Sequence, residues 1–204
     1  MKSTIFSIGH GHKSEEEFSL ELSSFDIKYL IDVRSSPYSK WSPHFNTGAI
    51  QVLLNRLRIK YIYMGDVIGG RPTDDSYYDN NGYYDYRLMA ENPDFKAGLN
   101  RIVLANSRQC RVAVMCSESD PTECHRSKLI GRELFFGHSI VMNHIIDSEK
   151  VVSQIEIMIA LTNGHWTPEG NLFGECPPPF FKSRKPYKTT EQPSYMPQLT
   201  NLYD

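Results

Sequence analysis

The sequence predicts an α/β fold: a mostly parallel, five-stranded, Rossmann-like sheet with helices on both faces, followed by a proline-rich C-terminal tail. Over the first two-thirds of the chain, short apolar runs alternate with segments whose apolar residues recur at helical spacing. Seven of the twelve prolines lie beyond residue 163, where this periodicity ends. We therefore expect an α/β domain over residues 1–163 and an extended tail over residues 164–204.

The first two strands and the helix between them follow from short local signals. A β-rich run over residues 4–8 stops at Gly9, and Ser14 with Glu17 forms a capping box that opens a helix. A nearly all-apolar run over residues 29–33 predicts the second strand, because a strand buried on both faces of a parallel sheet has no polar alternation.

The middle of the chain continues the alternation and then interrupts it. Apolar residues between 50 and 57 predict a helix, and residues 60–64 predict the third strand. Residues 65–85 are polar, rich in tyrosine and glycine, and aperiodic, which is typical of a functional loop. A further helix is expected to begin at Pro93, since proline is favoured in the first helical turn.

The last part of the predicted domain contains the clearest buried strand, residues 111–116. It leads through a loop into a helix capped at Asp120 or Thr122, and Gly137 is expected to be the C′ residue that ends this helix. The remaining elements are a fifth strand over residues 139–146 and a helix that Asp147 or Ser148 caps.

The composition excludes several classes of protein. The 204 residues are 40% hydrophobic and 23% charged with a formal net charge of −2, which excludes a global basic field for nucleic acid but not a local patch. No apolar run approaches about 18 residues and the first residues lack a signal-peptide core, so we expect a cytoplasmic protein with no membrane partner. The four cysteines form neither a disulfide framework nor a zinc-finger pattern, so we expect reduced thiols, no metal and no cofactor.

Candidate functional residues lie where the predicted parallel strands end, which is where such sheets bind ligands. His10 follows the first strand and is suited to acid/base work, although it is equally suited to packing in a loop. Asp32 interrupts an apolar run and must be paired. Arg34 is its natural partner, or is oriented by it toward a phosphate or carboxylate.

Two later segments carry further candidates. Gly69 and Gly70 would let the backbone approach a ligand beside an anion-binding Arg71, although the same string also suits an ordinary turn. The tyrosines of residues 65–85 would stack on bases or pack as a lid.

Cys116 ends the fourth strand, and eight residues later the run Cys124-His125-Arg126 opens the next helix. Amide groups at a helix start favour an anion and lower the pKa of a nearby thiol, although Cys116 also suits a small core hydrophobe. Cys116, Glu118, Cys124 and His125 offer metal-ligand atoms but lack a recognised spacing.

Four of these motifs together carry a resemblance, in the order Ser7-Ile8-Gly9-His10, Ile31-Asp32-Val33-Arg34, Ile68-Gly69-Gly70-Arg71 and Cys124-His125-Arg126. Over about residues 3–147 the chain resembles the family called domain of unknown function 488. The resemblance implies a Rossmann-like domain with these residues gathered at one end of the sheet, and it supplies no reaction. The Asp32-Val33-Arg34 strand end is also similar to rhodaneses, but Cys116 lacks their short, arginine-closed loop, which argues against sulfur transfer.

The leading hypothesis is an enzyme acting on a phosphorylated nucleotide or nucleic-acid substrate. The alternatives are a thiol-dependent transferase using Cys116 or Cys124, and a non-catalytic nucleotide- or nucleic-acid-binding module. Arginines would hold the anionic groups, His10 or His125 would act as general acid or base, and carboxylates would orient them. The predicted catalytic residues are His10, Asp32, Cys116, Glu118 and His125, and the predicted substrate-binding residues are Arg34, Gly69, Gly70, Arg71, Cys124 and Arg126.

Overall fold

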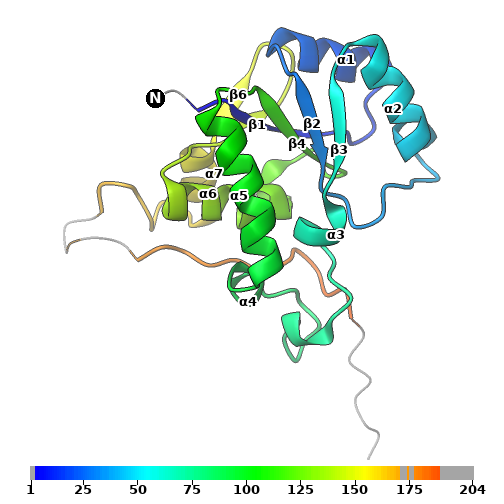
Figure 1. The fold of residues 1–204 in the computed structure, drawn as a ribbon. Helices are drawn as coiled ribbons and strands as arrows, with labels where there is room; N and C mark the ends of the chain where they lie inside the picture. Colours follow the sequence, from blue (N-terminus) through cyan, green and yellow to red (C-terminus); the bar gives the residue numbers. More distant parts are fainter. Residues whose placement is uncertain (1–2, 171–173, 175–176, 189–204) are drawn as a thin grey trace, which may run out of the picture.

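The computed structural model describes residues 3–170, 174 and 177–188, and it confirms the α/β class (Figure 1). The sheet has six strands rather than five, in the order β3-β2-β4-β1-β5-β6. All neighbouring strands are parallel except β5 and β6, so the sheet is mostly parallel, as predicted. The strands are β1 (Ile5–Gly9), β2 (Tyr29–Asp32), β3 (Lys60–Tyr63), β4 (Val112–Cys116), β5 (Asn143–Ile145) and β6 (Val151–Ser153).

The register of the central strands creates one functional edge. Gly9 at the end of β1 pairs with Cys116 at the end of β4, and Asp32 at the end of β2 pairs with Met115. Because the three strands are parallel and end together, the residues that follow them emerge at one place.

Helices cover both faces of the sheet (Figure 1). One buried cluster joins α1 and α2 to one face through residues such as Phe18 and Ile50, which pack with Ile8 of β1. The other cluster joins α5 and the segment after β4 to the opposite face, with Phe95 and Leu129 packed near Val114. The helices are α1 (Glu15–Ser24), α2 (Thr47–Arg56), α3 (Gly65–Ile68), α4 (Tyr86–Ala90), α5 (Pro93–Ser107), α6 (Arg132–His138) and α7 (Gln154–Leu161), and the short 3₁₀ and π turns are Pro43–Phe45, Asp75–Tyr77, Pro121–Glu123 and Arg126–Gly131.

Local capping agrees with the sequence at α1, where Ser14 and Glu17 form the expected capping box. It differs at α7, whose capping residue is Ser153 rather than Asp147 or Ser148. Asp147 instead accepts hydrogen bonds from the backbone N–H groups of residues 149 and 150, and so shapes the turn that leads into β6. The sixth strand was missed because three residues give no periodicity to read.

The single helix predicted after residue 120 is broken into three parts. A 3₁₀ turn, Pro121–Glu123, is followed by a π-helical turn, Arg126–Gly131, and then by α6. Gly137 lies inside α6 and is not its C′ residue, since the left-handed residue at the helix end is Ser139, with φ of 54°. The helix therefore runs past the position where glycine suggested an end.

The segment from 65 to 85 is not wholly irregular, because it contains α3 and a 3₁₀ turn, and part of the tail packs beside it. Ser183 is buried and its backbone N–H and hydroxyl both bond to the backbone of Tyr84. Further up the chain, Trp166 is 4% exposed and packs edge-on against Phe135 and Phe136. The described part of the tail thus wraps the domain.

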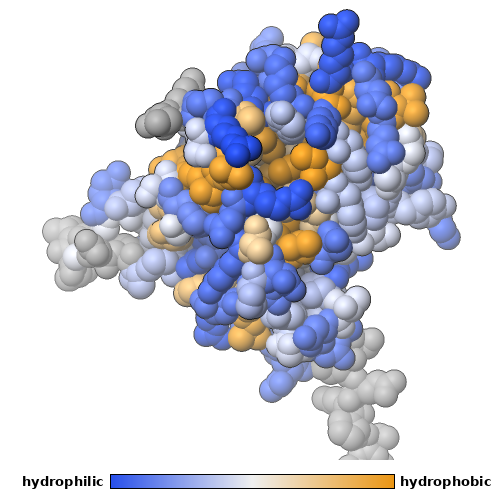
Figure 2. All heavy atoms as spheres, viewed as in Figure 1, coloured by the Kyte–Doolittle hydropathy of each residue, from blue (hydrophilic) through white to orange (hydrophobic). Residues whose placement is uncertain are grey.

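The surface viewed in Figure 2 is mainly hydrophilic, with hydrophobic residues emerging in patches between the charged ones. One hollow of about 270 Å³ lies between α5 and the edge of the sheet, lined by residues such as Ile62 and Leu104. No helix among the described residues is long and apolar enough to cross a membrane. Cys110, Cys116 and Cys124 are free thiols, and Cys176 lies outside the described residues.

Candidate functional site

A cavity of about 860 Å³ opens where β1, β2 and β4 end. Seven of the eleven residues singled out from the sequence line it: His10, Arg34, Gly70, Arg71, Cys116, Glu118 and His125. The other four, Asp32, Gly69, Cys124 and Arg126, are not part of its lining. The register of the parallel strands explains this convergence, since residues far apart in the chain follow neighbouring strand ends.

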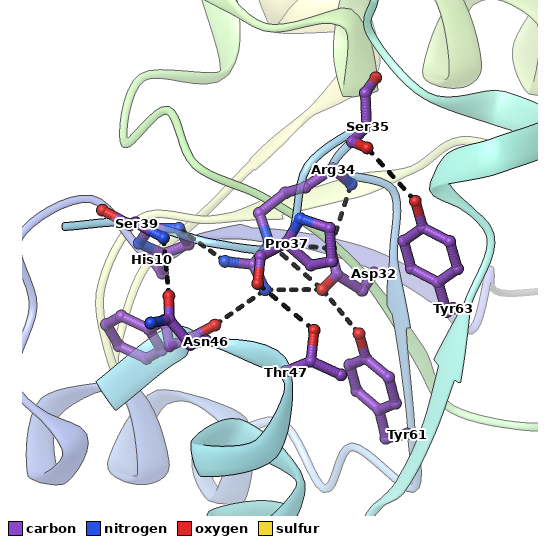
Figure 3. Close-up of polar contacts among 11 residues, drawn as sticks. His10, Asp32, Arg34, Ser35, Pro37, Ser39, Asn46, Thr47, Tyr61 and Tyr63 are labelled. Carbon is purple, nitrogen blue, oxygen red and sulfur yellow. Dashed lines mark hydrogen bonds and ion pairs between the residues drawn. The ribbon is translucent and has the colours of Figure 1, made fainter. Parts of the chain in front are cut away.

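One wall is built on a buried ion pair between Asp32 and Arg34 (Figure 3). The Arg34 Nη2 and Nε groups lie 2.6 Å and 2.9 Å from the Asp32 carboxylate oxygens, and both side chains are at most 3% exposed. The hydroxyl of Tyr61 donates to the same carboxylate at 2.9 Å. Asp32 is therefore fully paired, as burial of a carboxylate in an apolar strand requires.

His10 continues this wall from β1. Its Nδ1 lies 3.0 Å from the Gly11 carbonyl oxygen, so Nδ1 carries the proton, and Nε2 accepts from Arg34 Nη1 at 3.3 Å. The ring stacks on Phe45 with centroids 4.6 Å apart. Burial, and then the positive charge of Arg34, lower the pKa of His10 to about 4. A neutral ring with both nitrogens engaged orients Arg34, and the acid/base role of His10 stays a prediction.

The opposite wall carries two thiols, a carboxylate and an imidazole. Cys116 Sγ lies 2.9 Å from Glu118 Oε2 and 3.7 Å from His125 Nδ1. Cys124 Sγ lies 3.4 Å from the same Glu118 oxygen and also 3.7 Å from His125 Nδ1. Four groups able to exchange protons or to donate electron pairs therefore meet at one point.

The electrostatics of this wall follow from burial and mutual contact. Burial alone would raise the pKa of Glu118, but the hydrogen bond from Cys116 and the charge of His125 lower it overall. Burial would lower the pKa of His125, but Cys124 and Glu118 together raise it. For Cys124 the expectation of a lowered pKa is wrong, because complete burial and the neighbouring Cys116 raise it well above its usual value.

Arg126 does not reach the cavity. It is fully buried, and its Nη1 and Nη2 donate to the carbonyl oxygens of Glu118 and Ser119, the latter at 2.9 Å. Gly9 gives this loop room, since a Cβ there would lie 1.9 Å from the Glu118 carbonyl oxygen. Arg126 therefore braces the loop that presents Glu118, and its guanidinium faces these carbonyl groups rather than the cavity.

The two glycines before Arg71 serve close approach rather than flexibility. A Cβ on Gly70 would lie 2.6 Å from His125 Nδ1, and a Cβ on Gly69 would lie 2.1 Å from the Gly65 carbonyl oxygen. Gly70 thus keeps the space beside the imidazole open, while Gly69 permits a tight turn.

Arg71 is the cation of the cavity whose charge is least compensated. Its guanidinium carbon lies 4.5 Å from the ring centroid of Tyr187, and it forms no ion pair with any residue in the described part of the chain. The other two lining arginines are paired, Arg34 with Asp32 and Arg184 with Glu123. An incoming anion would therefore find Arg71 available.

Among the lining residues that sequence reasoning missed, four carry large or charged side chains that matter for a ligand. Tyr38 and Trp41 are 67% and 87% exposed at the rim, in a stretch that has no periodicity to draw attention to it. Arg184 and Tyr187 come from the tail, which was expected only to wrap or to dangle. A tryptophan within an irregular, polar stretch was the one signal available in the sequence, because a large aromatic side chain there suggests a contact surface.

Comparisons with known proteins identify the family of this chain but assign it no reaction. The family model described as "Domain of unknown function DUF488" matches residues 14–132, more than half of the chain. The match includes the strand ends that carry Asp32 and Cys116, the loop that carries Arg71, and the Cys124-His125-Arg126 run. No curated protein and no solved structure matches the chain.

Proposed function

We propose that this chain, which belongs to the family described as Domain of unknown function DUF488, is an enzyme acting on a phosphorylated nucleotide or nucleic-acid substrate. The proposal comes from the site, since the family supplies no reaction. The observation that carries this proposal is one cavity in which an uncompensated, tyrosine-stacked Arg71 shares the lining with the Cys116, Glu118 and His125 wall. An anion-binding group and proton-exchanging groups in one cavity are what a reaction on a phosphorylated substrate needs.

Arg71 is the group that would hold a phosphate. Guanidinium binds phosphate oxygens through paired hydrogen bonds, and stacking on Tyr187 fixes the plane of the guanidinium before the ligand arrives. Arg34 and Arg184 add positive charge nearby, although each is shared with a carboxylate. The expected ligand therefore carries a localised negative charge.

Aromatic rim residues support a nucleotide rather than a simple phosphate. Trp41 and Tyr38 are exposed at the cavity edge, where a base would stack on them. The volume of about 860 Å³ is in the range of sites that enclose a ligand of nucleotide size. The reacting bond would lie against Cys116, Glu118 and His125, where a proton or an electron pair is available for hydrolysis or group transfer.

Binding of a short, fluorescein-labelled single-stranded DNA, followed by fluorescence anisotropy, tests the proposal. Arg71→Ala should weaken binding at least tenfold, the scale of a charge-assisted hydrogen bond of about 1.5–3 kcal/mol. Trp41→Ala should weaken it by a similar factor. Arg101→Ala, on α5 and outside the cavity lining, is the matched control and should bind like the unaltered protein.

Equal affinity of the unaltered protein and Arg71→Ala, for the DNA and for UMP measured by calorimetry, would contradict the proposal. Binding without any product detected by mass spectrometry would favour the non-catalytic binding module instead. Both outcomes are read on the full chain.

A thiol-dependent transferase is the second candidate, and one observation favours it. Cys116 lines the cavity within hydrogen-bonding distance of Glu118, so its thiol borders the cavity and lies next to a proton acceptor. Rapid, selective alkylation of Cys116 by iodoacetamide, with loss of turnover, would identify this function. Cys124 is buried and outside the lining, so it should react more slowly than Cys116.

A further inference from the structure

The cavity wall that carries Cys116, Glu118 and His125 contains, together with the adjacent Cys124, a set of atoms suited to a metal ion. The Sγ atoms of Cys116 and Cys124 and a ring nitrogen of His125 all lie within 4.8 Å of one another, and the three side chains are buried. His125 Nδ1 is 3.7 Å from each sulfur. Three electron-pair donors therefore face a common centre from the end of β4 and the start of the following helix.

The spacing of these atoms agrees with tetrahedral coordination. Around zinc, with Zn–S near 2.3 Å and Zn–N near 2.0 Å, a sulfur and a nitrogen ligand lie about 3.5 Å apart. Both sulfur–nitrogen distances in the wall, 3.7 Å, are within a few tenths of an ångström of that separation. Side chains need only small adjustments to close on an ion.

We infer that Cys116, Cys124 and His125 bind a zinc ion at the cavity wall, through two sulfur atoms and Nδ1. Two thiolates and an imidazole are soft to borderline ligands, which select zinc over magnesium or calcium. Three protein ligands leave the fourth tetrahedral position free, and this is the arrangement of catalytic rather than structural zinc sites.

Glu118 marks where the fourth position lies. Its Oε2 is 2.9 Å from one sulfur and 3.4 Å from the other, and its side chain lines the cavity. Among the described residues no lysine or arginine pairs with this carboxylate. A divalent cation between the sulfurs would add positive charge beside this carboxylate, and Glu118 would then bind the ion or a water molecule on it.

Features around the cluster agree with an ion at this place. Gly70 leaves free the space beside His125 Nδ1 that any Cβ would fill, at 2.6 Å. The backbone changes from extended at Cys124 to helical at His125, which lets two consecutive side chains converge. A π-helical turn, Arg126–Gly131, follows directly, and such turns are frequent at functional sites.

The zinc ion would supply a Lewis acid to the reaction wall, and this part of the inference rests on the proposed function. The inference that the ion binds does not rest on the proposed function, because metal content is measured without any substrate. Loss of DNA binding with zinc retained would overturn only the proposed function, whereas DNA binding without zinc would overturn only this inference.

Elemental analysis of the full chain, purified under reducing conditions and desalted after incubation with zinc chloride, tests the inference. We expect about one zinc per chain, and at least tenfold less in Cys124→Ser and His125→Gln. Cys110→Ser removes a free thiol outside the cluster and should keep its zinc. Cobalt(II) in place of zinc should produce the visible absorption of a tetrahedral ion bound by thiolates, and the two cluster variants should lose it.

A zinc content near zero in the unaltered protein, or equal zinc in the cluster variants, would overturn the inference. If those variants fail to fold, alkylation of the unaltered protein tests the inference instead. Bound zinc should slow labelling of Cys116 and Cys124 by iodoacetamide, and removal of the metal with 1,10-phenanthroline should restore it. Equal labelling with and without the chelator would overturn the inference.

Discussion

His144 shows how a single buried residue ties the sheet to its helices. Its Nδ1 lies 2.6 Å from the hydroxyl of Ser7 on β1, and its Nε2 lies 2.8 Å from Gln154 Oε1 at the start of α7. Gln154 Nε2 donates to the carbonyl oxygen of Ser127, which fixes the amide orientation and hence the histidine tautomer. Burial, then the charge of Arg126, lower the pKa of His144 to about 3.

This arrangement predicts loss of stability in mild acid. Between pH 6.5 and pH 3 the unfolded chain protonates residue 144 while the folded chain does not, so protons favour unfolding as pH falls. The free energy of unfolding should decrease by about 1.4 kcal/mol per pH unit for this histidine over most of that window. His10, with a pKa of about 4, adds a similar slope above that pH.

Urea denaturation at a series of pH values measures the effect. His144→Gln should reduce the slope below pH 6 by about one proton, and His138→Gln, the same exchange at an exposed position of α6, is the comparison variant. A variant with the same slope as the unaltered protein would show that residue 144 takes up its proton in the folded state.

At the scale of elements, the sequence predicted the helices and strands whose positions are determined by residues close together in the chain. The capping box at Ser14 and the apolar run of β2 are local signals, and both elements lie where they were expected. The strand β6 was not predictable, because three residues gain their structure from pairing with β5 rather than from their own pattern. The π-helical turn after His125 was likewise hidden, since its sequence reads as ordinary helix.

The residues of the candidate site likewise fall into those that the sequence predicted and those that it did not. Strand-end residues such as His10 and Cys116 were found because the topology of a parallel sheet determines where they emerge. Tyr187 was not, because it reaches the cavity through tail contacts with no local signature. The sequence placed Arg126 correctly at the start of the helix after Cys124. It did not show that the guanidinium points toward carbonyl groups of the preceding loop, because that direction depends on the folded loop.

The end of α6 provides a prediction at this scale. Gly137 lies within the helix and a Cβ there would meet no atom within 4 Å, so Gly137→Ala should stabilise the protein by about 0.5–1 kcal/mol. Were Gly137 the left-handed C′ residue, the same substitution would destabilise it by about 1 kcal/mol. Gly131→Ala is the control and should be destabilising, because its Cβ would lie 2.1 Å from Gln154 Oε1.

At the scale of the whole molecule, the tail segment 177–188 contacts both the segment 65–85 and helix α6, which lie far apart in the sequence. Lys182 pairs with Asp79, and Arg132 contacts the carbonyl oxygen of Pro179 while its guanidinium covers the ring of Phe180 at 3.8 Å. Each exposed ion pair contributes little. The buried Ser183 and the partly buried Tyr187 make the segment part of both the fold and the cavity.

Shortening the chain separates these two contributions. A chain ending at Gly170 keeps Trp166 and the complete α/β domain, so it should still unfold cooperatively in urea. A chain ending at Asn163 should also remain folded, but about 2 kcal/mol less stable than the first, because Trp166 is 4% exposed and covers two phenylalanines. Both chains lack Tyr187, which leaves Arg71 unstacked, so both should bind the labelled DNA more weakly than the full chain. An insoluble or non-cooperative chain ending at Gly170 would show instead that the segment beyond it is required for the core to form.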